Sequence, residues 1–311
     1  MRRRLKSRRC ALAPVFLALA SVFAPSAAVG HTELIGTLAL PTPADVALPT
    51  PIDAYQGRVV WSEPSPTGYR LVEYHNGTAR QLPVAPSAAP FDVDLGPDRR
   101  GHIVAVYPRC ARALDYSNLG ALRGCDLYRY DLTRPGEIPL RSANTEKNEG
   151  YPAIWKGRLA FTRGDRFYWR WLSGVGRSRP LGKRPALSPS DVDLRGSLAA
   201  LAFEDGFDGG RLDLVRIGSR TRHLGWATSG VSIGRRFVHW LALWGDRYNG
   251  YYQMLTRYDR RTNSEERAYV PSLRAAWAFA RDGTTSYYMT RLDPECASCA
   301  WVVYRTTDLP L

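Results

Sequence analysis

The sequence predicts an all-β fold, and three observations support this prediction. Short runs of β-branched and aromatic residues alternate with Arg, Asp and Thr at a period of two, as in half-buried strands. No sustained 3.6-residue apolar stripe follows residue 30, so we expect almost no helix. With 44% hydrophobic and 11% aromatic residues, the chain can bury a large core, which excludes a disordered or fibrous protein.

The β-type runs belong to a repeat. Each copy contains a glycine, a short β-type run, a polar turn and a second, aromatic-rich β-type run. Successive repeat glycines lie 38 to 56 residues apart, about 45 on average, which matches a four-stranded propeller blade. We predict a single β-propeller domain over residues 31–311 with six blades, and five or seven blades are the alternatives. The six repeat glycines are Gly57, Gly101, Gly157, Gly196, Gly234 and Gly283.

The two ends of the chain are expected to close this ring. Blades must pack radially into a closed circle because a single blade cannot bury both of its faces. The last repeat reaches Leu311 without an outer strand, whereas residues 32–40 form a β-type run that no repeat uses. We predict that this N-terminal strand pairs with the last blade.

Residues 1–30 have the pattern of a secretory signal peptide. Six basic residues precede an apolar run of 14 residues from Ala11 to Ala24, followed by small residues. This run is shorter than the roughly 20 residues that span a bilayer, so we expect no membrane span. We expect the mature protein to be secreted or periplasmic.

Four cysteines follow the leader, and an even number in an oxidising compartment predicts disulfides. Three pairings are open, and proximity favours Cys110 with Cys125 and Cys296 with Cys299. The second pair has the C-x-x-C spacing of redox enzymes, but its flanks indicate a turn and a strand instead of a helix, so we expect a structural bridge.

The net charge is +14, and +8 remains once the six basic residues of the leader are set aside. Arginine is spread along the chain, which is typical of codon usage in a GC-rich genome and does not indicate a basic patch. We therefore expect no nucleic-acid partner, and we expect a monomer.

Three segments are similar to the TolB-type repeat of secreted bacterial propellers. They are Tyr151–Phe161, Leu95–Ala105 and Cys125–Leu132, which follow the family's outline of Pro, aromatic, turn and apolar strand. The resemblance covers roughly residues 50–311 and implies a six-bladed propeller. The mature chain has no room for the α/β domain that precedes the propeller in TolB itself, so the family's lipoprotein-binding role is not expected to carry over.

Two repeats contain the sequence Asp-Val-Asp-Leu, which places Asp92 with Asp94, and Asp191 with Asp193, on one face of a strand. Paired carboxylates are suited to cation binding or to glycoside hydrolysis. Because the pairs recur in register with the repeat, a structural role between blades is the simpler interpretation.

Other candidate motifs are weaker. Residues 230–234 match G-x-S-x-G, but a strand-like segment follows them where a nucleophile elbow needs a helix. The five histidines lack zinc-site spacing, and we expect no metal and no cofactor. Tryptophans are numerous enough for a sugar-stacking platform, although packing between blades is the simpler interpretation.

Two hypotheses of function remain. The first is a secreted binding or scaffold module for a protein or an envelope polysaccharide, without catalysis. The second is a propeller-type glycoside hydrolase or lyase with carboxylates facing the channel. Carboxylates about 5–10 Å apart at the channel mouth would favour hydrolysis, whereas carboxylates engaged in contacts between blades would favour a scaffold.

Overall fold

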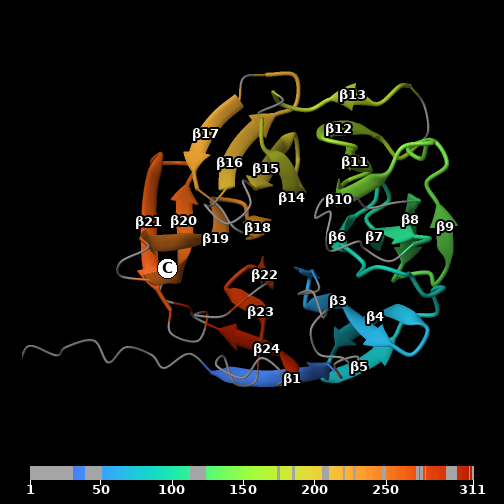
Figure 1. Ribbon diagram of the computed structural model, residues 1–311, viewed down its shortest axis with the longest axis horizontal. Helices are drawn as coiled ribbons and strands as arrows, with labels where there is room; N and C mark the ends of the chain where they lie inside the picture. The colour runs from blue at the N-terminus through green and yellow to red at the C-terminus, as the bar shows by residue number, and fades with distance from the viewer. Residues whose placement is uncertain are drawn as a thin grey trace, which may run out of the picture.

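The computed structural model describes residues 31–38, 51–112, 124–173, 176–183, 186–204, 210–219, 221–226, 229–246, 250–270, 273, 276, 278–291, 300–307 and 309. These residues form six four-stranded antiparallel sheets. The sheets stand around a common axis as the blades of a propeller (Figure 1). The described part of the chain contains no α-helix. The predicted all-β fold and the count of six blades are confirmed.

The strand nearest the axis comes first in each blade, and the later strands follow outwards. Blade 1 is β2 (Ile52–Tyr55), β3 (Arg58–Ser65), β4 (Gly68–His75) and β5 (Thr78–Gln81). Blade 2 is β6 (Asp94–Pro97), β7 (Ile103–Cys110), β8 (Cys125–Asp131) and β9 (Glu137–Pro139). Blade 3 is β10 (Glu149–Trp155), β11 (Arg158–Arg163), β12 (Arg166–Trp171) and β13 (Arg179–Pro180).

The second half of the ring repeats this order. Blade 4 is β14 (Ser188–Arg195), β15 (Leu198–Glu204), β16 (Gly210–Arg216) and β17 (Thr221–Gly225). Blade 5 is β18 (Ser229–Ile233), β19 (Phe237–Asp246), β20 (Gly250–Asp259) and β21 (Ser264–Tyr269). Blade 6 is β22 (Ala278–Asp282), β23 (Thr285–Arg291), β24 (Trp301–Thr307) and the N-terminal strand β1 (Thr32–Leu38).

Strand β1 closes the ring as predicted. It pairs antiparallel with β24, with Thr32 opposite Thr306 and Leu38 opposite Trp301, and the blue and red ends of the chain meet in this blade (Figure 1). The Glu33 carboxylate accepts hydrogen bonds from the Arg305 guanidinium at 3.3 Å and from the Tyr74 hydroxyl at 3.2 Å. Because Tyr74 belongs to blade 1, the N-terminal strand also ties blade 6 to its neighbour.

The hydrophobic core consists of six main clusters, one between each pair of neighbouring blades. Adjacent residues of one strand belong to different clusters because side chains alternate between the two faces of a sheet. Val59 packs toward blade 6, whereas Val60 packs toward blade 2, and both are fully buried. This arrangement explains why the second strands are apolar at consecutive positions.

The innermost strands approach one another closely at Gly96 on β6. A Cβ atom at this position would lie 2.1 Å from the carbonyl oxygen of Ile154 on β10. No side chain fits in that space, so the contact between blades 2 and 3 requires glycine here.

Cys110 and Cys125 form a disulfide, as predicted, between directly opposite positions of β7 and β8. Cys296 and Cys299 lie outside the described residues, as does the proposed signal peptide. In the described part of the chain, we find no helix that is long and apolar enough to cross a membrane.

Candidate functional site

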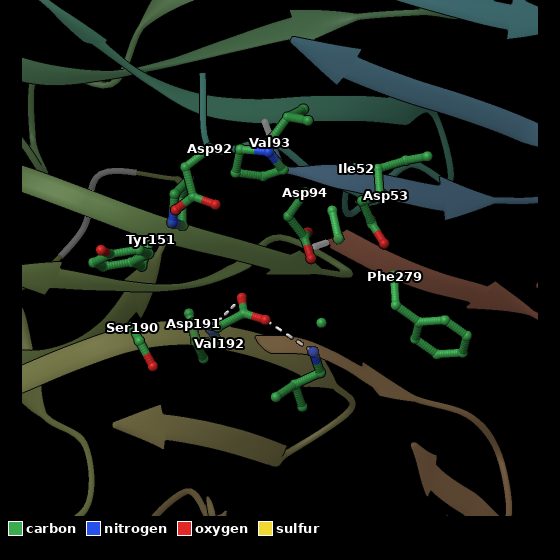
Figure 2. A pocket seen from close by; sticks show the side chains of 15 residues that line it. Ile52, Asp53, Asp92, Val93, Asp94, Tyr151, Ser190, Asp191, Val192 and Phe279 are labelled. Atoms are coloured by element: carbon green, nitrogen blue, oxygen red, sulfur yellow. Dashed lines mark hydrogen bonds between the residues drawn. The ribbon is translucent and has the colours of Figure 1, made fainter. Parts of the chain in front are cut away.

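The innermost strands of the six blades surround a channel along the propeller axis. Its narrow part is a cavity of about 110 Å³, to which every blade contributes residues of its first strand or of the segment just before it. Figure 2 shows this cavity with the carboxylates of Asp53, Asp92, Asp94 and Asp191 around it.

The structure brings all four predicted aspartates to the channel. Asp92, Asp94 and Asp191 line the narrow cavity, and Asp193 lies further along the axis in the adjoining, wider cavity. Asp53 of blade 1 is a fifth channel carboxylate, which the sequence analysis missed. Like Asp94, Asp53 lies on the first strand of its blade. The local sequence Ile-Asp-Ala-Tyr contains a single aspartate and lacks the paired Asp-Val-Asp pattern.

The channel carboxylates bind the backbone of the next blade. Asp53 accepts a hydrogen bond of 2.6 Å from the N–H of Leu95, and Asp94 accepts one of 2.7 Å from the N–H of Ile154. The equivalent bonds from blade 4 to blade 5 join Asp191 to the N–H of Val231 at 2.9 Å, and Asp193 to the N–H of Ile233. The innermost strand of a blade pairs with a neighbouring strand on its outer side only. Each of these bonds therefore satisfies an N–H group that points to the unpaired side of the strand.

Burial raises the pKa of every carboxyl group in this set. For Asp191 and Asp193 burial outweighs the backbone hydrogen bonds and raises the pKa to about 6. The pKa values of Asp53, Asp92 and Asp94 are raised well above 3.8, first by burial and then by repulsion from the other channel carboxylates. The channel therefore carries less negative charge at neutral pH than five aspartates would otherwise give.

Among the described residues, no group of three or more His, Cys, Asp or Glu side chains has an arrangement that would hold a metal ion. One carboxylate oxygen, Oδ2 of Asp92, is buried without a hydrogen-bond partner.

The channel widens at one end into a cavity of about 460 Å³. We call this end the hairpin mouth because it lies at the turns that join the first and second strands of the blades. Its lining includes Tyr55, Trp155, Arg195, Arg235 and Arg281. The guanidinium of Arg195 lies over the Trp155 ring, 4.4 Å from the ring centroid, and Tyr55 contacts the same ring edge-on at 5.6 Å.

The arginines of the hairpin mouth are the part of the site that sequence analysis missed. Every first turn has a basic residue one or two positions from the repeat glycine, so residues that are spread along the sequence lie on one face of the ring. The signal was present as a basic residue within two positions of each repeat glycine. These basic residues are Arg58, Arg100, Lys156, Arg195, Arg235 and Arg281.

His239 lies in the wall of the hairpin mouth on β19. Its side chain is 4% exposed, and its Nε2 atom has no hydrogen-bond partner. Burial, followed by repulsion from Arg281 and Arg257, lowers its pKa to about 3, so the imidazole is neutral at physiological pH.

The described part of the chain includes the G-x-S-x-G match and most of the tryptophans. Ser232, the central residue of the G-x-S-x-G match, lies on strand β18 and donates to the carbonyl oxygen of Arg281 at 3.2 Å. Strand β19 follows it, which excludes a nucleophile elbow here. Among the described tryptophans, Trp240 is buried between blades 4 and 5, whereas Trp226 is 62% exposed.

No protein-family model matches the chain, and no curated protein matches its sequence. Solved structures do resemble it. A chain of the nidogen/laminin complex has a TM-score of 0.51 at 12% identity, over 78% of this chain and 85% of that chain. TolB from Acinetobacter baumannii has a TM-score of 0.50 at 11% identity, over 82% of this chain and 64% of that chain.

These likenesses show the fold. The chain is a six-bladed β-propeller whose structural neighbours include TolB, as its repeats predicted. It spans about two thirds of the length of the TolB chain.

Proposed function

We propose that this protein is an extracytoplasmic binding module, without catalytic activity, that presents the hairpin mouth to a protein or an envelope polysaccharide. One observation carries the proposal. The channel carboxylates, which are the best candidates for acid–base chemistry, accept backbone hydrogen bonds that hold neighbouring blades together. Their geometry therefore supports a scaffold, and the open cavity at the hairpin mouth supplies a concave surface for a ligand.

The proposed location rests on two features. The leader has the pattern of a secretory signal, and the disulfide between Cys110 and Cys125 is expected in an oxidising compartment. We expect the mature propeller to act as a monomer and without a cofactor.

Retention on envelope material tests the binding role. Purified mature protein is incubated separately with cell-wall polysaccharide and with envelope proteins, then washed at rising salt concentration. Specific binding predicts a stoichiometric complex that survives high salt, because attraction due to net charge alone is screened. Loss of all retention at moderate salt would contradict the proposal.

One observation favours the alternative, a glycoside hydrolase or lyase. Asp92 has a buried carboxylate oxygen without a partner, and burial raises the pKa of this carboxyl group, which is the direction that a general acid requires. The test is release of reducing or unsaturated ends from envelope glycans. Activity that disappears in Asp92→Asn would establish the enzyme and overturn the non-catalytic role.

A further inference from the structure

The hairpin mouth has more positive than negative charge available to a ligand. Among the described residues, Lys156, Arg195 and Arg235 have no carboxylate within ion-pair distance, and Lys156 and Arg235 are exposed. The acidic residues at this end already have partners: Asp282 accepts a hydrogen bond from the N–H of Gly57 at 2.7 Å, and Asp259 pairs with Arg236. Asp53 and Asp193, which line the deeper part of the cavity, bind backbone N–H groups of the next blade.

Arg195 is held in position before any ligand arrives. Its guanidinium lies over the Trp155 ring, and it donates one long hydrogen bond of 3.4 Å to the carbonyl oxygen of Ile233. A guanidinium fixed in this way leaves N–H groups for a carboxylate or phosphate, with less conformational entropy to lose on binding.

Deeper in the same cavity lie polar groups that are suited to binding neutral hydroxyls. The carboxyl oxygens of Asp53 and Asp193 line the cavity and retain acceptor capacity beyond the backbone N–H groups that they bind. The buried Nε2 of His239 has no partner, so it is an orphaned polar atom in the cavity wall. Tyr55 and Phe237, both half-buried, add aromatic surface beside these groups.

We propose that the hairpin mouth binds an anionic sugar unit of an acidic polysaccharide. The acid group of the sugar pairs with Arg195 and Arg235, its hydroxyls bind the carboxyl groups of Asp53 and Asp193 and the imidazole of His239, and its apolar ring face contacts the aromatic side chains. This inference rests on the proposed binding function and specifies its ligand. An acidic peptide would satisfy the arginines, but it presents fewer hydroxyl groups than a sugar to the buried carboxyl groups and imidazole.

Calorimetric titration of the full mature protein tests the inference at physiological salt. The anionic probes are oligogalacturonate, which carries carboxylates, and glucose 6-phosphate, which carries phosphate. Neutral galacto-oligosaccharide and poly-L-glutamate test the need for charge and for the sugar. We expect at least one anionic sugar to bind with one site per chain, and both controls to bind at least tenfold more weakly.

Two charge-reversal variants locate the site. Arg235→Glu changes an exposed side chain at the hairpin mouth and is expected to weaken binding by tenfold or more. Arg141→Glu makes the same charge change on an exposed residue of the segment between β9 and β10, on the face of the ring opposite the hairpin mouth, and is expected to alter affinity less than twofold.

Equal binding of poly-L-glutamate, or equal effects of the two variants, would overturn the inference, and so would no binding of either anionic sugar. If a salt-resistant complex with an envelope component persists in any of these cases, the proposed binding function stands. If that complex is also absent, both proposals fail.

Discussion

The carboxylate of Asp94 accepts a hydrogen bond of 2.7 Å from the backbone N–H of Ile154, 60 positions later on the innermost strand of the next blade. Both residues are almost completely buried. Corresponding bonds from Asp53, Asp191 and Asp193 join two other pairs of blades, so side chains complete hydrogen bonding where separate sheets meet around the axis. These four channel aspartates thus contribute to the contacts between blades.

Two substitutions of Asp94 separate its hydrogen bond from its charge. Asp94→Ala leaves the N–H of Ile154 buried without a partner and is expected to lower the free energy of unfolding by about 1–3 kcal/mol. Asp94→Asn keeps the acceptor and removes repulsion from Asp53, so we expect it to be at least as stable as the parent at pH 7.5. Urea unfolding measures both, with Asp126→Ala on β8 as the control. An alanine variant as stable as the parent would refute the structural role.

The channel carboxyls make stability depend on pH. The pKa of Asp191 is about 6 in the folded protein and near 3.8 in the unfolded chain, so between these values the folded state binds more protons. Its contribution to stability is therefore largest at low pH and falls as the pH rises from about 4 through 6. We expect the melting temperature of the parent, relative to that of Asp191→Asn, to be higher at pH 5 than at pH 7.5.

Measuring this difference cancels the contribution of other groups. His239 has the opposite effect, because its lowered pKa makes the folded state bind fewer protons between pH 6.5 and 3, so its contribution is lost as the pH falls. A difference between parent and Asp191→Asn that is the same at both pH values would contradict the raised pKa of Asp191.

The disulfide between Cys110 and Cys125 closes a loop with a sequence separation of 15 residues. Restricting such a loop in the unfolded chain stabilises a protein by about 3 kcal/mol. We expect the double variant Cys110→Ser/Cys125→Ser to lose about this much in urea unfolding without a reductant. Unchanged stability would show that the bond adds nothing to the paired strands β7 and β8.

A substitution at Gly96 tests the close contact between blades 2 and 3. Gly96→Ala forces the carbonyl of Ile154 to move, since the added Cβ would lie 2.1 Å from its oxygen, and we expect a loss of about 1–3 kcal/mol. Gly136→Ala is the matched control, because a Cβ there meets nothing closer than 3.9 Å. Chemical denaturation of both proteins should separate them clearly. Equal stability of the two variants would mean that the blades approach less closely than described.

The repeat made the architecture predictable from sequence. Alternation of apolar residues marks strands, regular spacing of the glycines marks blades, and the unused run at Thr32 marks the closing strand. The aspartate pairs were also visible because they recur in register with the repeat. Asp53 was not, since a single aspartate within Ile-Asp-Ala-Tyr has no paired pattern to mark it.

The hairpin mouth could not be recognised from the linear sequence for a geometric reason. Basic residues such as Arg195, Arg235 and Arg281 are about 40 residues apart, which looks like an even distribution. A repeat of nearly the same length brings them to one end of the channel. Likewise, nothing in the sequence distinguishes His239 from other histidines, because its unpartnered Nε2 depends on how β19 packs.

The central claim is that this propeller binds its ligand at the hairpin mouth. The most direct measurement compares salt-resistant retention of the parent and of Arg235→Glu on the same envelope polysaccharide, with Arg141→Glu as the control. Our account predicts that the parent and Arg141→Glu remain bound at high salt and that Arg235→Glu is washed away. Equal retention of all three proteins, or release of all three at moderate salt, would contradict it.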